Sequence, residues 1–176
     1  MFTTVAMLLV PTLIFRALGA FGVSRFAGWR LSFTHGLAVM LLMTGLAHFM
    51  PDSVEVMPGH DDLTAMVPSF VPFPDFMVYL TGVLEIACAV GLFFASTRTL
   101  SAATLIVLFI VMLPANINAA VNDIPFDGDP ATPLWFRIPE QLVYIAVAFG
   151  AITIAGNGWA RRLPNPGRLA VSPTQN

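Results

Sequence analysis

Apolar residues dominate five long stretches of the chain, at about 1–22, 31–50, 75–96, 99–121 and 134–156. Each stretch is close to the roughly 20 residues that a helix needs to cross the hydrocarbon core of a bilayer. Most of the charged residues fall in the connections between the stretches. The pattern therefore predicts an all-α integral membrane protein with five transmembrane helices.

Composition agrees with this pattern, because 57% of the residues are hydrophobic and only 10% are charged. The chain contains no lysine, so arginine alone carries the topological signal. Arginines follow the first, third and fifth stretches, whereas the second and fourth connections hold aspartates and a glutamate. Cytoplasmic loops tend to hold the basic residues of a membrane protein. We therefore expect a multi-pass protein of the cell membrane, with its N-terminus outside and its C-terminus in the cytoplasm.

The two ends of the chain differ from the middle. The first segment, residues 1–23, contains a proline and an arginine and could be a secretory signal, but it lacks the basic start that a signal peptide normally has. We therefore expect a transmembrane segment here. Residues 157–176 include the polar, proline-containing run "LPNPGRLAVSPTQN" and are expected to form a disordered cytoplasmic tail.

The second connection contains the run "DDLTAMVPSFVPFPDF", in which two aspartates precede apolar residues at helical spacing. This favours a short amphipathic helix that lies on the outer membrane surface or covers the end of the helices. A proline-rich connector with a few buried apolar side chains is the alternative.

Several kinds of chemistry are excluded by the residues present. Cys88 is the only cysteine, so the chain cannot pass electrons through an internal disulfide. His35 and His48 lie thirteen residues apart on one predicted helix, about 20 Å along its axis, which does not suit a shared haem. No phosphate-binding loop, zinc-type cluster or basic nucleic-acid surface occurs, so we expect no intrinsic cofactor and no nucleic-acid partner.

A glutamate at the midpoint of the third stretch, Glu85, is the most informative residue, because polar side chains are costly inside a membrane and often functional. Helical spacing places small and polar residues on the face of Glu85 and bulky residues on the other faces. Glu85 is therefore expected to point toward the other helices. The residues sharing its stripe are Val78, Thr81, Gly82, Cys88, Ala89 and Leu92.

Other polar residues lie at similar depths on the neighbouring stretches. Measured from the outer helix ends at 1.5 Å per residue, His48 lies a few ångström deep, Asn116 and Glu140 roughly 7–9 Å, and Glu85 about 15 Å. Arg137 is spaced to meet Glu140 and Gln141 on one helix face. We expect a polar cavity that opens outward with Glu85 at its floor. A local ion pair and buried hydrogen bonds between helices are the structural alternative.

Several short runs resemble the DoxX-like family of small membrane proteins. They are "HF" at 48–49, "MVPSFVPFP" at 66–74, "VYLTGVLEIACAVGL" at 78–92, "PANI" at 114–117 and "RIPEQ" at 137–141. The resemblance covers about residues 30 to 156. It implies a compact four-helix transmembrane bundle over residues 31–156, to which the first segment is an N-terminal fifth helix. Some members are described as subunits of quinol oxidase or thiosulfate–quinone oxidoreductase systems, but this chain has no cysteine pair and no evident haem ligands.

Two function classes remain. In the first, the protein is the membrane subunit of a quinone-linked redox system, with a soluble oxidoreductase partner. His48 and Glu85 would exchange protons with the oxygens of a quinone or similar lipophilic molecule, and Thr81, Asn116, Arg137, Glu140 and Gln141 would bind or orient it. In the second class, the same residues serve a non-redox, isomerase-like membrane enzyme or a lipophile-binding protein. An assembly protein is a third possibility.

Overall fold

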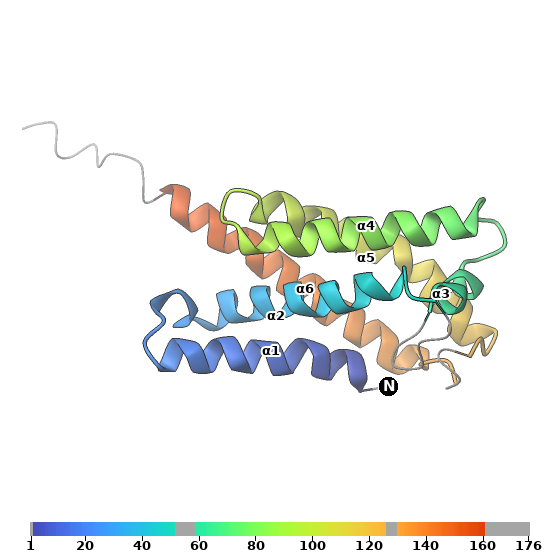
Figure 1. The fold of residues 1–176 in the computed structure, drawn as a ribbon, viewed down its shortest axis with the longest axis horizontal. Helices are drawn as coiled ribbons and strands as arrows, with labels where there is room; N and C mark the ends of the chain where they lie inside the picture. The colour runs from blue at the N-terminus through green and yellow to red at the C-terminus, as the bar shows by residue number, and fades with distance from the viewer. Residues whose placement is uncertain (1, 52–58, 126–129, 161–176) are drawn as a thin grey trace, which may run out of the picture.

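The computed structural model describes residues 2–51, 59–125 and 130–160, with side chains up to residue 154. This part of the chain is helical and contains no β-strand (Figure 1). The predicted stretches become helices whose ends differ by a few residues from the sequence pattern. The elements are α1 (Thr3–Ala20), η1 (Ser24–Phe26), α2 (Trp29–Ala47), α3 (His60–Met66), α4 (Pro74–Phe93), α5 (Arg98–Val121) and α6 (Leu134–Ala160).

Five helices, α1, α2, α4, α5 and α6, are long and apolar enough to cross a membrane, as the sequence predicts. The last helix is longer than expected. It continues to Ala160, so the first four residues of the predicted tail are helical. Residues 161–176, including three arginines on which the topology prediction depends, lie outside the described residues.

The long helices pack side by side, and four of them form a ring in which each contacts two neighbours. α2 contacts α4 and α6, and α5 also contacts α4 and α6, while α1 packs along α2. Apolar side chains from these helices fill the space between them, since burying them against one another gives the dense packing of a protein interior. The core contains Leu37, Leu41, Ala89, Leu92, Leu105 and Ala148, each no more than 1% exposed.

The two faces of α4 follow the prediction from helical spacing. Glu85 and its stripe are buried, except for Thr81, which is half-buried. Tyr79 and Val83, on the opposite side, are 45% and 54% exposed. Small residues on the inner face allow α2 and α4 to approach closely, and a Cβ atom added to Gly82 would lie 2.5 Å from the Cβ atom of His48. The side chain of His48 therefore packs directly on the backbone of α4 at Gly82, which fixes how the two helices are aligned.

The short helix α3 confirms the helical interpretation of the second connection. It lies across one end of the long helices and packs on α4 and α5 (Figure 1). α4 then begins at Pro74, a favourable first helical position because proline has no N–H group to leave unsatisfied there. α3 therefore covers the end of the molecule at which α4 begins.

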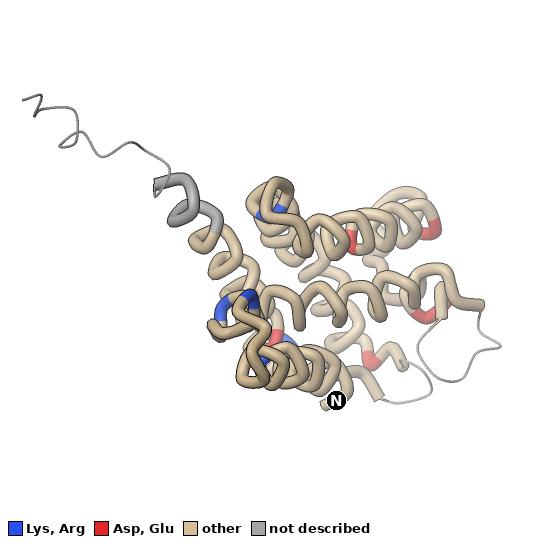
Figure 2. Tube along the Cα trace, turned by 60° about the vertical axis from the view of Figure 1, so that its left-hand side comes forward, with Lys and Arg blue, Asp and Glu red and all other residues tan. Residues whose placement is uncertain are grey.

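Charged residues separate toward the two ends (Figure 2). Among the described residues, arginines lie near the α1–α2 and α4–α5 connections, whereas most acidic residues lie toward the end that α3 covers. Arg137, Glu85 and Glu140 are inside the spans and are discussed below. The basic and acidic connections that alternate along the sequence thus lie at opposite ends of the structure.

Candidate functional site

His48 and Glu85 meet beneath α3. His48 follows the last residue of α2, and Glu85 lies in the middle of α4; they are 4% exposed each. His48 Nε2 and Glu85 Oε2 are 3.9 Å apart, which is within ion-pair range but too long for a hydrogen bond. The sequence predicted that both residues face inward, and the structure brings them together across two helices.

The contact of His48 Nδ1 determines which ring nitrogen carries the hydrogen. His48 Nδ1 lies 2.8 Å from the carbonyl oxygen of Val78. A carbonyl only accepts hydrogen bonds, so Nδ1 carries a hydrogen and donates it. His48 Nε2 is therefore the atom that can accept or release a proton on the side of Glu85.

Two threonines hold this pair in place. Thr44, one turn before His48 on α2, donates from Oγ1 to Glu85 Oε2 over 3.0 Å. Thr81 donates to carbonyl groups of its own helix over 2.9 Å, and its oxygen lies 3.3 Å from His48 Nδ1. The sequence suggested Thr81 as a ligand-binding residue. In the structure it contacts Nδ1 of His48, the ring nitrogen that faces away from Glu85, and helps to orient the ring.

A second polar cluster joins α5 and α6. Arg137 donates from Nε and Nη2 to Asn116 Oδ1 over 3.1 and 2.9 Å, and from Nη1 to Glu140 Oε2 over 2.9 Å. Tyr144 donates to Glu140 Oε1 over 2.7 Å, and Thr4 of α1 donates to the same oxygen. Glu140 therefore accepts hydrogen bonds from three side chains, which hold its carboxyl group in one orientation.

The second cluster forms part of the wall of a small cavity. His48, Thr81 and Glu85 are not among its lining residues, so it is not the cavity that the sequence predicted with Glu85 at its floor. The cavity has a volume of about 30 Å³, room for a water-sized group, and two of its walls are Asn116 and Arg137. The remaining lining residues are Met66, Ala119, Ile124, Ala131 and Thr132.

Gln141, which the sequence suggested as a ligand-binding residue, contacts the backbone of α5. Its Nε2 atom donates to the carbonyl oxygen of Phe109 over 2.8 Å, in the turn before Pro114. Pro114 removes the N–H group that would donate to the carbonyl of Ile110, the residue after Phe109, so Gln141 contacts α5 beside this break. One N–H of the Gln141 amide therefore joins α6 to α5.

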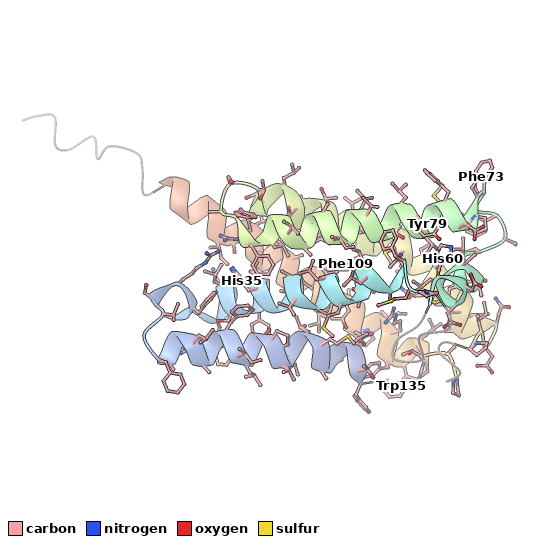
Figure 3. The ribbon with its side chains drawn as sticks, in the orientation of Figure 1. His35, His60, Phe73, Tyr79, Phe109 and Trp135 are labelled. Atoms are coloured by element: carbon pink, nitrogen blue, oxygen red, sulfur yellow. The ribbon has the colours of Figure 1, made fainter. Side chains whose placement is uncertain are left out.

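His60 ties α3 to the first cluster. Its Nδ1 atom donates to the carbonyl oxygen of His48 over 2.9 Å, and its ring stacks on Tyr79 with centroids 4.1 Å apart (Figure 3). Its Nε2 atom lies 3.4 Å from Asp75 Oδ1. At the other end of α3, Asn118 donates to the carbonyl oxygen of Met66 over 3.0 Å. α3 is thus held on both sides above the His48–Glu85 pair.

The structure groups the predicted residues more sharply than the sequence did. His48, Glu85 and Thr81 form one cluster, and Asn116, Arg137 and Glu140 form another. Sequence reasoning left out Thr44, Thr4 and Tyr144 as site residues. Thr44 lies one turn from His48 and Tyr144 one turn from Glu140, so helical spacing offered a signal for both, whereas nothing in the sequence places Thr4 near Glu140.

No set of three histidine, cysteine, aspartate or glutamate side chains in the described parts of the chain is arranged to hold a metal ion. A comparison with curated proteins finds no match, and a comparison with solved structures finds none either. The resemblance to the DoxX-like family therefore stays a prediction. Residues 37–151 do match a family model, and this range begins within α2 and ends within α6, so it includes both polar clusters apart from Thr4. The chain accordingly belongs to the family described as a domain of unknown function, DUF8561.

Proposed function

We propose that this protein is the membrane subunit of a quinone-linked redox system, in which the His48–Glu85 pair binds an oxygen atom of a quinone or similar lipophilic molecule. In this proposal α2, α4, α5 and α6 form a four-helix bundle in the cell membrane, and α1 is added beside α2. The end covered by α3 faces outside. The separation of arginines from acidic residues supports this orientation.

The distance between His48 Nε2 and Glu85 Oε2 is the observation that carries the proposal. The two atoms are 3.9 Å apart, less than twice a hydrogen-bond length of about 2.8 Å, so one oxygen atom can lie within reach of both. This oxygen atom would lie beside His48 Nε2 and the carboxyl group of Glu85, and each of these groups can donate or accept a proton. This is an acid–base pair for a hydroxyl or carbonyl group of a ligand.

The reaction in this proposal is the interconversion of a quinol and a quinone. Oxidation of a quinol releases two electrons and two protons. The proton of the hydroxyl group between the pair would pass to His48 Nε2 or Glu85, and the proton of the other hydroxyl group would pass to water. Both electrons would pass to a soluble oxidoreductase partner, since Cys88 is the only cysteine and is buried. Asn116 would orient the rest of the ring through its amide nitrogen, because its Oδ1 atom already accepts from Arg137.

A non-redox function uses the same two residues. Proton-transfer isomerisation of a lipophilic molecule needs one group that removes a proton and one that returns it, and the His48–Glu85 pair supplies both without an electron acceptor. The arrangement favours this alternative in one respect, because it requires no partner protein. Binding of a lipophile without catalysis would use the same oxygen position.

The proposal is tested by ligand binding to the purified full chain in mild detergent. A short-chain ubiquinone or menaquinone analogue is added, and the bound fraction is measured by native mass spectrometry. Glu85→Gln keeps the shape of the side chain but removes its proton exchange and its charge, and His48→Gln removes the ring. Each is expected to weaken binding by about 10-fold or more, the loss of one hydrogen bond to a charged group.

A matched pair of threonine variants separates ligand binding from folding. Thr44→Val removes the donor to Glu85, whereas Thr153→Val removes a hydroxyl group that only contacts the carbonyl of Gly150 on its own helix. Weaker binding in Thr44→Val alone supports the proposal. Unchanged binding in Glu85→Gln, together with loss of folding in Glu85→Leu, would overturn it and assign Glu85 a purely structural role. Turnover of a quinol with an added electron acceptor distinguishes the redox reaction from the non-redox alternative.

A further inference from the structure

A group of cationic side chains lies at the opposite end of the molecule from α3. Arg25 precedes α2 in η1, and Arg98 begins α5. Both reach the C-terminal end of α4, where Arg25 Nη2 donates to the carbonyl oxygen of Phe93 over 2.5 Å and Arg98 Nε donates to that of Leu92 over 3.2 Å. Because these carbonyls belong to adjacent residues, the two guanidinium groups are neighbours.

Arg25 has a second partner that does not neutralise it. Its Nη2 atom lies 3.1 Å from Nε2 of His35, a histidine that is 1% exposed and lies at the end of the molecule opposite His60 (Figure 3). His35 Nδ1 donates to the carbonyl oxygen of Leu31 over 2.8 Å. Its Nε2 atom is therefore an acceptor for the arginine, and the ring is neutral. This histidine therefore does not offset the charge of Arg25, and no described acidic side chain forms an ion pair with it.

Arg98 is the more unusual of the two cations, because it is only 5% exposed. Within the described part of the chain, its Nε atom donates to a carbonyl oxygen, whereas its two Nη atoms have no hydrogen-bond acceptor. These two atoms are not completely buried. The positive charges of Arg98 and Arg25 act on each other and are mutually repulsive. Two neighbouring guanidinium groups therefore present free N–H donors at one place.

Among the described residues, no carboxylate forms an ion pair with Arg25 or Arg98. The described acidic residues lie near α3 or within the α4–α6 region, away from this end (Figure 2). A buried cation without a counter-charge is costly, and the partial negative charge of a helix C-terminus offsets only part of that cost. Favourable C-terminal capping of α4 explains the Arg25 Nη2 and Arg98 Nε bonds. It leaves the Arg98 Nη atoms unexplained.

The geometry points to a binding site for a phosphate-type oxyanion between Arg25 and Arg98. Guanidinium groups bind phosphate oxygens through paired N–H donors, and one anion between the two would remove their repulsion. The site lies where α4 ends and α5 begins, at the level of lipid headgroups for helices that span a bilayer. The anionic headgroup of a phospholipid is therefore one source of this oxyanion, and free phosphate is the other.

The test uses the full chain purified in a neutral detergent. Native mass spectrometry counts bound phosphatidylglycerol, with phosphatidylcholine as the neutral comparison, and a thermal-shift assay measures stabilisation by inorganic phosphate. Arg25→Gln and Arg98→Gln are expected to lower phosphatidylglycerol binding by about 10-fold or more, the loss of one charge-assisted contact. Arg30→Gln is the matched control, because Arg30 is an exposed arginine at the start of α2 and has no contact with this pair.

The outcomes separate the sources and the alternatives. Selective loss of phosphatidylglycerol in Arg25→Gln and Arg98→Gln supports a lipid site, whereas selective loss of the phosphate-induced shift supports a free anion. Equal losses in Arg30→Gln would overturn the site and leave only a general attraction to charge, and so would unchanged binding in Arg25→Gln. Because Arg98 is buried, Arg98→Lys is included; it keeps the charge and is expected to bind more weakly, since lysine lacks the paired donors.

Discussion

Gly82→Ala is expected to displace His48 from Glu85. A Cβ atom at position 82 would lie 2.5 Å from His48 Cβ, 2.8 Å from His48 Cγ and 3.0 Å from Phe49 Cε2. Ordinary contacts between carbon atoms are about 3.5–4.0 Å, so the histidine must move by about 1 Å. Its 2.8 Å hydrogen bond to Val78 would then exceed the usual length.

The size of this effect follows from two terms. Overpacking a tight contact costs about 1–3 kcal/mol, and loss of the His48–Val78 hydrogen bond costs about 1 kcal/mol more. Alanine also has a better helix propensity than glycine, by about 0.8–1.0 kcal/mol, which acts in the opposite direction. Gly150→Ala isolates the propensity term, because no atom lies within 4 Å of the added Cβ atom.

The assay is reversible unfolding of both variants in mixed micelles, followed by circular dichroism. Gly82→Ala is expected to be less stable than Gly150→Ala by about 2–4 kcal/mol in the free energy of unfolding. It should also bind the quinone analogue more weakly, while Gly150→Ala binds it normally. Equal stability of the two variants would refute the steric reasoning, and normal ligand binding by Gly82→Ala would refute the role given to the position of His48.

Three further predictions concern other contacts. Gly36→Ala would place a Cβ atom 1.9 Å from Thr12 Oγ1, so it should separate α1 from α2. The free energy of unfolding should fall by about 1–3 kcal/mol in the same assay, and unchanged stability would contradict this. Tyr144→Phe removes a donor to Glu140 and should cost about 1.5–3 kcal/mol by denaturant titration, an effect that should vanish when Glu140 is already glutamine. Asn118→Leu removes the bond to the C-terminal end of α3 and should speed hydrogen exchange in residues 60–66 without changing exchange in α2; equal exchange would show that α3 is held in another way.

Helical periodicity was enough to predict which face of α4 is buried, because spacing along one helix is fixed by its geometry. It also placed Arg137 and Glu140 on one face of α6, where the structure shows a hydrogen bond between them. These are relations within a single helix. A membrane helix without charge on its surface reveals its inner face through small and polar residues, and the sequence contains that information.

Relations between helices could not be predicted in the same way. The approach of His48 to Glu85 depends on how far α2 slides along α4, and the contact at Gly82 sets that register. The bond from Thr4 to Glu140 depends on where α1 packs, which periodicity does not specify. The distance of each residue from the predicted outer end of its helix gave partial information about these contacts, since it placed His48 and Glu85 in the same half of the molecule.

In the proposed arrangement, in which α4 crosses the bilayer, the position of Glu85 also makes any proton that reaches it sensitive to voltage. Glu85 is the twelfth of the 20 residues of α4, so a proton moving to it from either face would cross roughly half of the electric field across the bilayer. Moving a full charge across a potential of about 100 mV is worth about 2.3 kcal/mol, so half of the path is worth about 1.2 kcal/mol. A change of about 100 mV would therefore alter the protonated fraction at Glu85 by up to about sevenfold. Chemistry at this carboxyl group would respond to the energy state of the membrane even if nothing else in the protein moved.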